Sequence, residues 1–525
     1  MSRNEISLLD RTFVGLGWRF VSTFSRFATH FIVGVILARL LPVEAFGLFT
    51  LAMIIVGTAT VVSEIGLAPA VVQRTDITET HVRVGFTMSI IGGAMLTTTT
   101  IFVAPFLSHF LHTREVIPVL RLLSLTFLFT SFSSVAGALL TKRLDFRRLF
   151  WAEILSYIFS FGGVGVTLGL CNYGVWALAW AYVTQSLVRT GLILRFSPHP
   201  MRLSLRITEA RELLRFGIGM SLARLMNYAA RNGDYFVVGR WLGTEALGLY
   251  SRAYQLMTLP ISEFSSVISF VLFPAFAEIQ NEEERLRKAY LRSISVATFV
   301  VFPILTGMAI VAPELISGIF GSKWTGAIVA TQLLCIGGIG RCVYNLGDAL
   351  VRAKGAVYAQ FLRHFVYSVA VFSASLIGAY WGIEGVAVGI VIALGIMYLL
   401  MAQLSLKLIG GSWRQFFEAQ TPGLIFSALI ASVAFPTTMI LRTRELPDLI
   451  ILFGTMMACS IITVIVALVF PRRWLGEGPL WAIHQLDRIR HRNRTLRSFF
   501  VHGFRWMRVK SLFATDVEHN PSQER

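Results

Sequence analysis

Arginines inside apolar stretches are the residues of this sequence with the clearest potential for chemistry. Arg19 and Arg26 lie seven residues apart in the first apolar stretch, and Arg224 and Arg231 repeat this spacing in the seventh. Seven residues make two turns of an α-helix, so each pair shares one helix face. Arg341 interrupts a later apolar stretch. Because guanidinium groups bind phosphate oxygens through paired hydrogen bonds, these five residues predict a cationic cavity for an anionic, pyrophosphate-like substrate.

Acidic residues also lie inside apolar stretches. Glu64, Asp234, Glu263 and Asp348 are candidates for binding a coupling proton or sodium ion, because an ionisable group inside a membrane normally has a function or a partner. They could equally pair with the arginines. Arg231 and Asp234 are three residues apart, a spacing at which two side chains can neutralise each other. The sequence leaves these two interpretations open.

The depth of a polar residue within its helix predicts whether its side chain can reach the membrane surface. Arg26 lies about 13 residues into its stretch, roughly 20 Å at 1.5 Å per residue, too deep to reach either membrane surface. Arg121 and Arg252 lie one or two turns from a helix end, where reaching toward the interface is the expected behaviour. His30 follows Arg26 by one turn and fits a hydrogen-bonded packing residue better than a proton relay.

The elements that carry these residues are transmembrane helices. Of 525 residues, 55% are hydrophobic and 14% are charged, whereas a soluble domain has roughly 25% charged residues. The mean hydropathy is +0.67, and apolar stretches reach the ~20 residues that cross a bilayer as a helix. We predict an all-α integral membrane protein with about fourteen spans, near residues 13–37, 46–72, 84–107, 116–140, 149–171, 174–194, 213–240, 246–276, 289–312, 325–351, 358–380, 384–406, 421–441 and 447–470.

The basic residues predict the orientation in the membrane. Lys and Arg are concentrated in alternate loops, such as 142–148, 202–211 and 285–292, and are few in the loops between them. The positive-inside rule therefore places both termini in the cytoplasm. The same distribution explains the net charge of +18 without nucleic-acid binding. The loops are too short to hold a soluble catalytic domain, and no metal or cofactor motif is present, so we predict a carrier and not an enzyme.

An internal repeat divides the chain into two halves. Residues 38–49 read ARLLPVEAFGLF, and residues 239–250, offset by 201, read GRWLGTEALGLY, with six of twelve positions identical. Six helices separate the copies, so the halves have the same orientation and are expected to be related by an axis along the membrane normal. We predict two pseudo-symmetric six-helix lobes, residues 1–195 and 196–408, followed by two C-terminal helices within residues 409–470.

The tail at residues 471–525 differs from the rest of the chain. Arginines between 488 and 508 alternate with leucine and phenylalanine at helical spacing. This pattern predicts a basic amphipathic cytoplasmic helix that binds anionic membrane lipid.

The sequence resembles the polysaccharide-exporter branch of the multidrug/oligosaccharidyl-lipid/polysaccharide flippase superfamily. The segments that carry the resemblance are residues 38–49, SEIGLAPAVVQR at 63–74, LLTKRLDFRRL at 139–149 and LGLYSRAYQLMTLP at 247–260. The resemblance implies alternating access between two lobes in the bacterial inner membrane. The implied cargo is a polyprenyl-pyrophosphate-linked oligosaccharide for O-antigen, capsule or exopolysaccharide synthesis, and polysaccharide polymerase machinery is an implied partner.

Two other functions are compatible with parts of the sequence. A cation-coupled multidrug extruder of the same superfamily would have the same fold, but would carry acids where the first and seventh helices carry arginines. A membrane-bound polymerase or ligase would need a long periplasmic loop with catalytic residues. The sequence contains no such loop, so the flippase interpretation is favoured.

Overall fold

The computed structural model describes residues 25–63, 78–143, 145–198, 200, 202–204, 206, 228 and 231–469, and only the backbone of 62–63, 263–271, 274 and 467–469. Arg19, Arg224, Glu64 and the tail at 471–525 lie outside the described residues, as do the start of the first span and most of the seventh. Throughout the described part the regular secondary structure is helical and there is no strand.

The first half of the chain forms one set of helices. It comprises residues 25–40, α2 (Val43–Ser63), α4 (Glu79–Leu111), α5 (Val116–Lys142), α6 (Phe146–Tyr157), which continues through η1 (Ile158–Gly165) into α7 (Val166–Leu170), and α8 (Val175–Phe196). Within this set α5 packs against α4 and α8, and α8 packs against α6 and η1.

The second half forms another set. It comprises residues 231–237, η2 (Val238–Leu242), α10 (Gly243–Glu278), α11 (Glu283–Ile310), α12 (Ala312–Glu314), η3 (Leu315–Phe320), η4 (Ser322–Ala327), α13 (Ile328–Ala353), α14 (Val357–Gly378), η5 (Ala379–Trp381), α15 (Gly382–Leu408), α16 (Trp413–Glu418), α17 (Thr421–Thr443) and α18 (Asp448–Val469). Here α13 is central, in contact with α10, α11 and α15.

The helix lengths confirm an all-α membrane protein. In the described part, nine helical segments are long and apolar enough to cross a membrane, and one of them, 357–408, contains both α14 and α15. Individual boundaries agree closely with expectation: the span predicted at 116–140 is α5, and the one at 384–406 is α15. The total of fourteen spans and the lobe limits at 195, 408 and 470 stay predictions.

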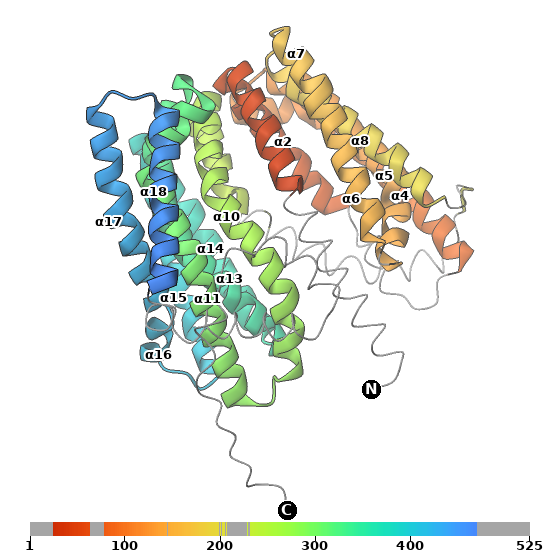
Figure 1. Cartoon of the computed structure of the whole chain (residues 1–525). Coiled ribbons are helices and arrows are strands. Elements are labelled where there is room, and N and C mark those ends of the chain that lie inside the picture. The colour runs from red at the N-terminus through yellow and green to blue at the C-terminus, as the bar shows by residue number, and fades with distance from the viewer. Residues whose placement is uncertain are drawn as a thin grey trace, which may run out of the picture.

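The two sets meet along α2 and α10 at one end of the molecule and diverge toward the other (Figure 1). In the sequence repeat, Gly47 corresponds to Gly248 and Val43 to Thr244. A Cβ atom on Gly47 would lie 1.6 Å from the Thr244 carbonyl oxygen, and one on Gly248 would lie 2.4 Å from the Val43 carbonyl oxygen. Each copy's glycine therefore admits the backbone of the other copy, and any side chain there would force the helices apart.

Hydrogen bonds across the two sets close the same end. Arg39 donates from Nε to the Ile319 carbonyl oxygen at 2.7 Å and from Nη2 to the Gly318 carbonyl oxygen. In the opposite direction, Lys323 Nζ donates to the carbonyl oxygens of Arg39 at 2.9 Å and Leu41 at 2.5 Å. These carbonyls end two helices and lack partners within them, so cations suit them. We call residues 38–48, 239–248 and 314–324 the closed end.

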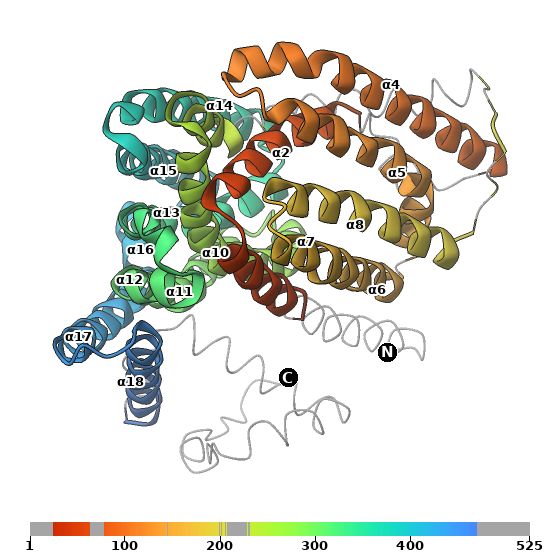
Figure 2. The ribbon, with the colours of Figure 1, turned by 90° about the horizontal axis from the view of Figure 1, so that it is seen from above.

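The last two long helices are fixed to the second set. Arg442 of α17 donates to both carboxylate oxygens of Glu314, at 2.6 and 3.0 Å. Farther along, a Cβ atom on Gly423 would lie 2.6 Å from the Thr298 carbonyl carbon, so α17 and α11 cross with their backbones nearly in contact. Figure 2 shows α17 and α18 at the outer corner of this set, away from the first set.

The orientation prediction can be tested at three positions that lie at opposite ends of the molecule. The last turn of α5, which ends at Lys142, and the first turns of α11, which contain Lys288, lie at the end opposite the closed end, and the connection between α7 and α8, which contains Asn172, lies near the closed end (Figure 1). We expect a reporter fused after Lys142 or Lys288 to give a cytoplasmic signal and one fused after Asn172 a periplasmic signal. Paired phosphatase and fluorescent-protein fusions would measure this, and reversed signals would refute the orientation.

Candidate substrate-binding site

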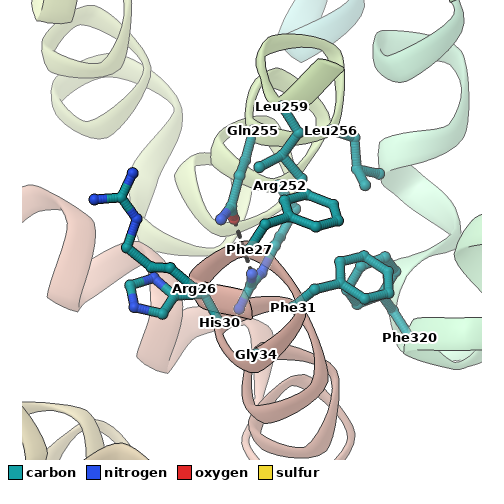
Figure 3. A pocket seen from close by; sticks show the side chains of 10 residues that line it. All are labelled: Arg26, Phe27, His30, Phe31, Gly34, Arg252, Gln255, Leu256, Leu259 and Phe320. Carbon is teal, nitrogen blue, oxygen red and sulfur yellow. Dashed lines mark hydrogen bonds between the residues drawn. The ribbon is translucent and has the colours of Figure 1, made fainter. Parts of the chain in front are cut away.

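A cavity of about 110 Å³ lies between the two sets of helices beside the closed end. The helix at 25–40 contributes one wall, α10 contributes the other, and η3 closes it. Figure 3 shows Arg26 and His30 on one side, the aromatic rings on the other, and Arg252 with Gln255 between them. The cavity is lined by Arg26, Phe27, His30, Phe31, Gly34, Arg252, Gln255, Leu256, Leu259 and Phe320. Both halves of the chain therefore build one site that contains two arginines.

Arg252 is the central cation of this site. Its Nη1 donates to Gln255 Oε1 at 2.9 Å, and its guanidinium carbon lies 4.3 Å from the centroid of the Phe46 ring. A Cβ atom on Gly34 would lie 3.9 Å from Arg252 Nη1, so the guanidinium reaches the first helix beside a residue without a side chain. Among the described residues, no carboxylate lies within ion-pair distance of Arg252.

Arg26 is exposed on the same cavity, and it too has no acidic partner within ion-pair distance in the described part of the chain. His30 stacks on Tyr157 of α6 with ring centroids 3.7 Å apart. Its buried Nε2 has no hydrogen-bond partner among the described residues. The stacking agrees with a packing role for His30, and the free nitrogen leaves a polar atom close to the cationic site.

Asp234 and Arg231 do not neutralise each other. Arg231 is exposed, whereas Asp234 is 1% exposed and accepts a hydrogen bond from Tyr250 at 2.8 Å. The second carboxylate oxygen, Oδ1, has no hydrogen-bond partner in the described part of the chain. Asp234 is therefore a buried acid with an oxygen available to a proton or ion, and Arg231 does not line the cavity.

Arg341 lies inside the second set of helices and does not line the cavity with Arg26 and Arg252. Its Nη1 donates to the Tyr254 hydroxyl at 2.6 Å, and its guanidinium carbon lies 5.3 Å from the centroid of that ring. Tyr254 contacts Tyr235, which contacts Tyr250, the hydrogen-bond donor to Asp234. Arg341 and Asp234 thus belong to one tyrosine-rich cluster, and a role of Arg341 in substrate binding stays a prediction.

Asp348 already has partners. His364 Nε2 lies 3.0 Å from its Oδ1, and Gln360 donates to the same atom at 2.9 Å. This group joins α13 to α14 near the end opposite the closed end. Glu263 lies on α10, but its side chain is outside the described residues. Of the two predicted acids whose side chains the structure describes, Asp234 therefore has the arrangement that better fits ion coupling.

Arg252 is the site residue that sequence reasoning missed. Its position near the start of α10 predicted that it would reach toward the membrane interface, and this was wrong because the closed end covers that part of the helix. The repeat contains a usable signal: Leu51 occupies the corresponding position in α2. An arginine in one copy opposite a buried leucine in the other marks a functional difference between the halves.

The arrangement favours anion binding. The cavity contains two guanidinium groups that have no acidic partner among the described residues, together with a neutral amide and aromatic rings. Such groups can hold phosphate oxygens and exclude water. No group of three or more His, Cys, Asp or Glu side chains able to hold a metal occurs among the described residues. Two helix sets joined at one end, with a cavity between them that contains an arginine from each, are typical of a membrane carrier of the multidrug/oligosaccharide flippase type.

The chain belongs to the polysaccharide biosynthesis protein family, whose pattern it matches over residues 36–329, more than half of its length. It is similar to the lipopolysaccharide biosynthesis protein WzxC of Escherichia coli K12, with 28% identity over 82% of this chain and 89% of the relative. It is also similar to the succinoglycan biosynthesis transport protein ExoT of Rhizobium meliloti, with 28% identity over 70% of this chain and 78% of the relative. The resemblance to the polysaccharide-exporter branch is thereby confirmed.

A solved structure supports the fold. The lipid II flippase MurJ in an inward closed conformation superposes with a TM-score of 0.69, covering 86% of this chain and 99% of MurJ at 17% sequence identity. At this identity the match concerns the fold alone.

Proposed function

We propose that this protein is a flippase that moves polyprenyl-pyrophosphate-linked oligosaccharides across the bacterial inner membrane, with the pyrophosphate bound between Arg26 and Arg252. The observation that carries the proposal is the position of these two arginines on one cavity, each from a different half of the chain and neither with an acidic partner among the described residues. The relatives named for lipopolysaccharide and succinoglycan synthesis support the cargo class.

The closed end explains how such a site could face one side at a time. Under the orientation predicted from the basic loops, the closed end is periplasmic and the divergent end faces the cytoplasm. The cargo enters from the cytoplasmic side, the anionic head binds the arginines, and the lipid chain stays in the bilayer. Separation of the two sets at the closed end then opens the site to the periplasm, in the manner of alternating access.

Reconstitution tests the function directly. Purified full-length protein in liposomes should transfer a polyprenyl-pyrophosphate-linked oligosaccharide between leaflets, measured as loss of protection from an external glycosidase. The alternative, a cation-coupled multidrug extruder, predicts export of cationic dyes instead. Dye export without oligosaccharide transfer would refute the flippase proposal. The buried acid Asp234 is compatible with both functions, because a carboxylate can bind a transported cation in an extruder or a coupling ion in a flippase. The two transport assays therefore distinguish the functions.

Asp234 is the proposed coupling residue, for a proton or for sodium. We expect Asp234→Asn to remove the response of transport to the coupling gradient, because an amide cannot bind and release a proton and binds a cation weakly. Asparagine still accepts the Tyr250 hydrogen bond, so the expected loss of stability is small, about 1 kcal/mol. Transport measured with imposed pH or sodium gradients tests this, with Asp348→Asn as a control whose carboxylate already has two partners. An unchanged gradient response of Asp234→Asn would exclude this residue.

The remaining partners follow from the same proposal. The basic tail at 471–525 is assigned to anionic lipid on the cytoplasmic surface. Delivery of cargo on the periplasmic side would require polysaccharide polymerase machinery nearby. No cofactor enters the mechanism.

A further inference from the structure

Aromatic rings from both halves of the chain surround the Arg252 guanidinium. Its Cζ atom lies 4.3 Å from the ring centroid of Phe46 in α2, 5.5 Å from that of Trp324 and 5.9 Å from that of Phe320. Gln255 accepts one of its hydrogen bonds. An arginine held in this way over ring faces keeps its charge while the remaining N–H groups stay available to a ligand.

These rings are also part of the closed end. Phe46 packs edge-on against Trp324 with centroids 5.3 Å apart, and Trp324 Nε1 donates to the Ala38 carbonyl oxygen at 3.0 Å. Phe46 immediately precedes Gly47, where α2 and α10 are in backbone contact. If the halves separate here, Phe46 moves with the first half and Trp324 with the second, so Arg252 loses the ring that lies closest to it.

We propose that Phe46 and Trp324 are positioning residues that hold Arg252 in its anion-binding geometry only while the closed end is shut. Opening of this end then lowers the affinity for the pyrophosphate and releases the cargo on that side. The inference rests on the proposed function and adds a coupling between binding and opening. Coupling of this kind is reciprocal, so a bound anion also stabilises the closed end.

Binding measurements separate this inference from the proposed function. With farnesyl pyrophosphate as probe and full-length protein in detergent, we expect Phe46→Leu to weaken binding roughly two- to thirtyfold and Phe46→Tyr to restore it. Phe49→Leu is the matched control, since Phe49 lies on the same helix but packs against Tyr182. If Arg252→Ala binds the probe like the wild type, the proposed function fails. If Arg252→Ala weakens binding but Phe46→Leu does not, only the positioning role is wrong.

A cross-linking measurement tests the reciprocal effect. Arg240 lies over the rings of Phe110 and Trp241, which come from different halves and are about half exposed. The test uses one chain that carries both Phe110→Cys and Trp241→Cys and in which the four native cysteines are replaced. A short bis-maleimide should cross-link the two new cysteines faster when farnesyl pyrophosphate is present. The acceleration should disappear with Phe46→Leu. An unchanged or slower reaction with the probe would overturn the coupling.

Discussion

Replacing Arg252 or Arg26 by alanine is expected to reduce oligosaccharide transfer roughly tenfold or more, because each change removes charge-assisted hydrogen bonds to the pyrophosphate. Lysine keeps the charge but loses the planar fork, so Arg26→Lys should fall between alanine and the wild type. The measurement is accumulation of undelivered lipid-linked oligosaccharide on the cytoplasmic face, scored together with the amount of protein in the membrane.

Arg121 provides the control for these variants. It is exposed on α5 and does not line the cavity, so Arg121→Ala should transport normally. The same assay applies to Arg19 and Arg224. If Arg26→Ala, Arg252→Ala and both of these alanine variants export normally at normal protein levels, the arginines are structural and the binding model is wrong.

The second large effect is expected at the reciprocal glycine contact. Gly47→Ala and Gly248→Ala each place a Cβ atom within 2.5 Å of a carbonyl oxygen of the opposite half, so the closed end must separate to accommodate it. Overpacking of this kind costs about 1–3 kcal/mol, which shifts the balance between closed and open states roughly 5- to 150-fold toward open. Both variants should lose most of their transport while remaining in the membrane.

Opening can be followed at Ala38, which is completely buried beside Trp324. The reporter is Ala38→Cys in a chain whose exposed Cys171 is replaced by serine. It should react with a membrane-impermeant maleimide in the two glycine variants and stay protected in the chain that keeps both glycines. Gly137→Ala is the control, because nothing lies within 4 Å of a Cβ atom at this position. Protection of Ala38→Cys in both glycine variants would contradict a tight closed end.

The sequence predicts helices well because lipid leaves the backbone few alternatives. An apolar run long enough to span must be a helix, and local signals mark its ends. Thr78 caps α4 with its side chain, and Ser412 forms a capping box with Gln415 in α16. The depth of Arg26 along its helix predicted that the side chain faces water inside the protein and does not reach the membrane surface, and in the structure Arg26 lines the cavity.

Contacts between helices could not be derived in the same way. Arg231 and Asp234 have a spacing that allows pairing, but Asp234 turns inward to Tyr250, 16 residues away, and Arg231 is exposed. Arg252 was misjudged because distance from a helix end was equated with distance from the membrane surface. The two distances differ where another part of the chain covers the helix end. This cover is visible only in the three-dimensional packing of α2 on α10.

The glycine contact at the closed end also bears on how such a chain could arise. Gly47 meets residue 244 and Gly248 meets residue 43, and this is the pattern of a two-fold homodimer, where residue i of one subunit touches j of the other and j touches i. A six-helix ancestor that dimerised in parallel would form the same contact before gene duplication and fusion joined its copies. In such a dimer an arginine at both Leu51 and Arg252 positions would bring two like charges to the axis. In a fused chain the two positions can differ, as Leu51 and Arg252 do here, so the cavity between the two sets receives only one of the two like charges.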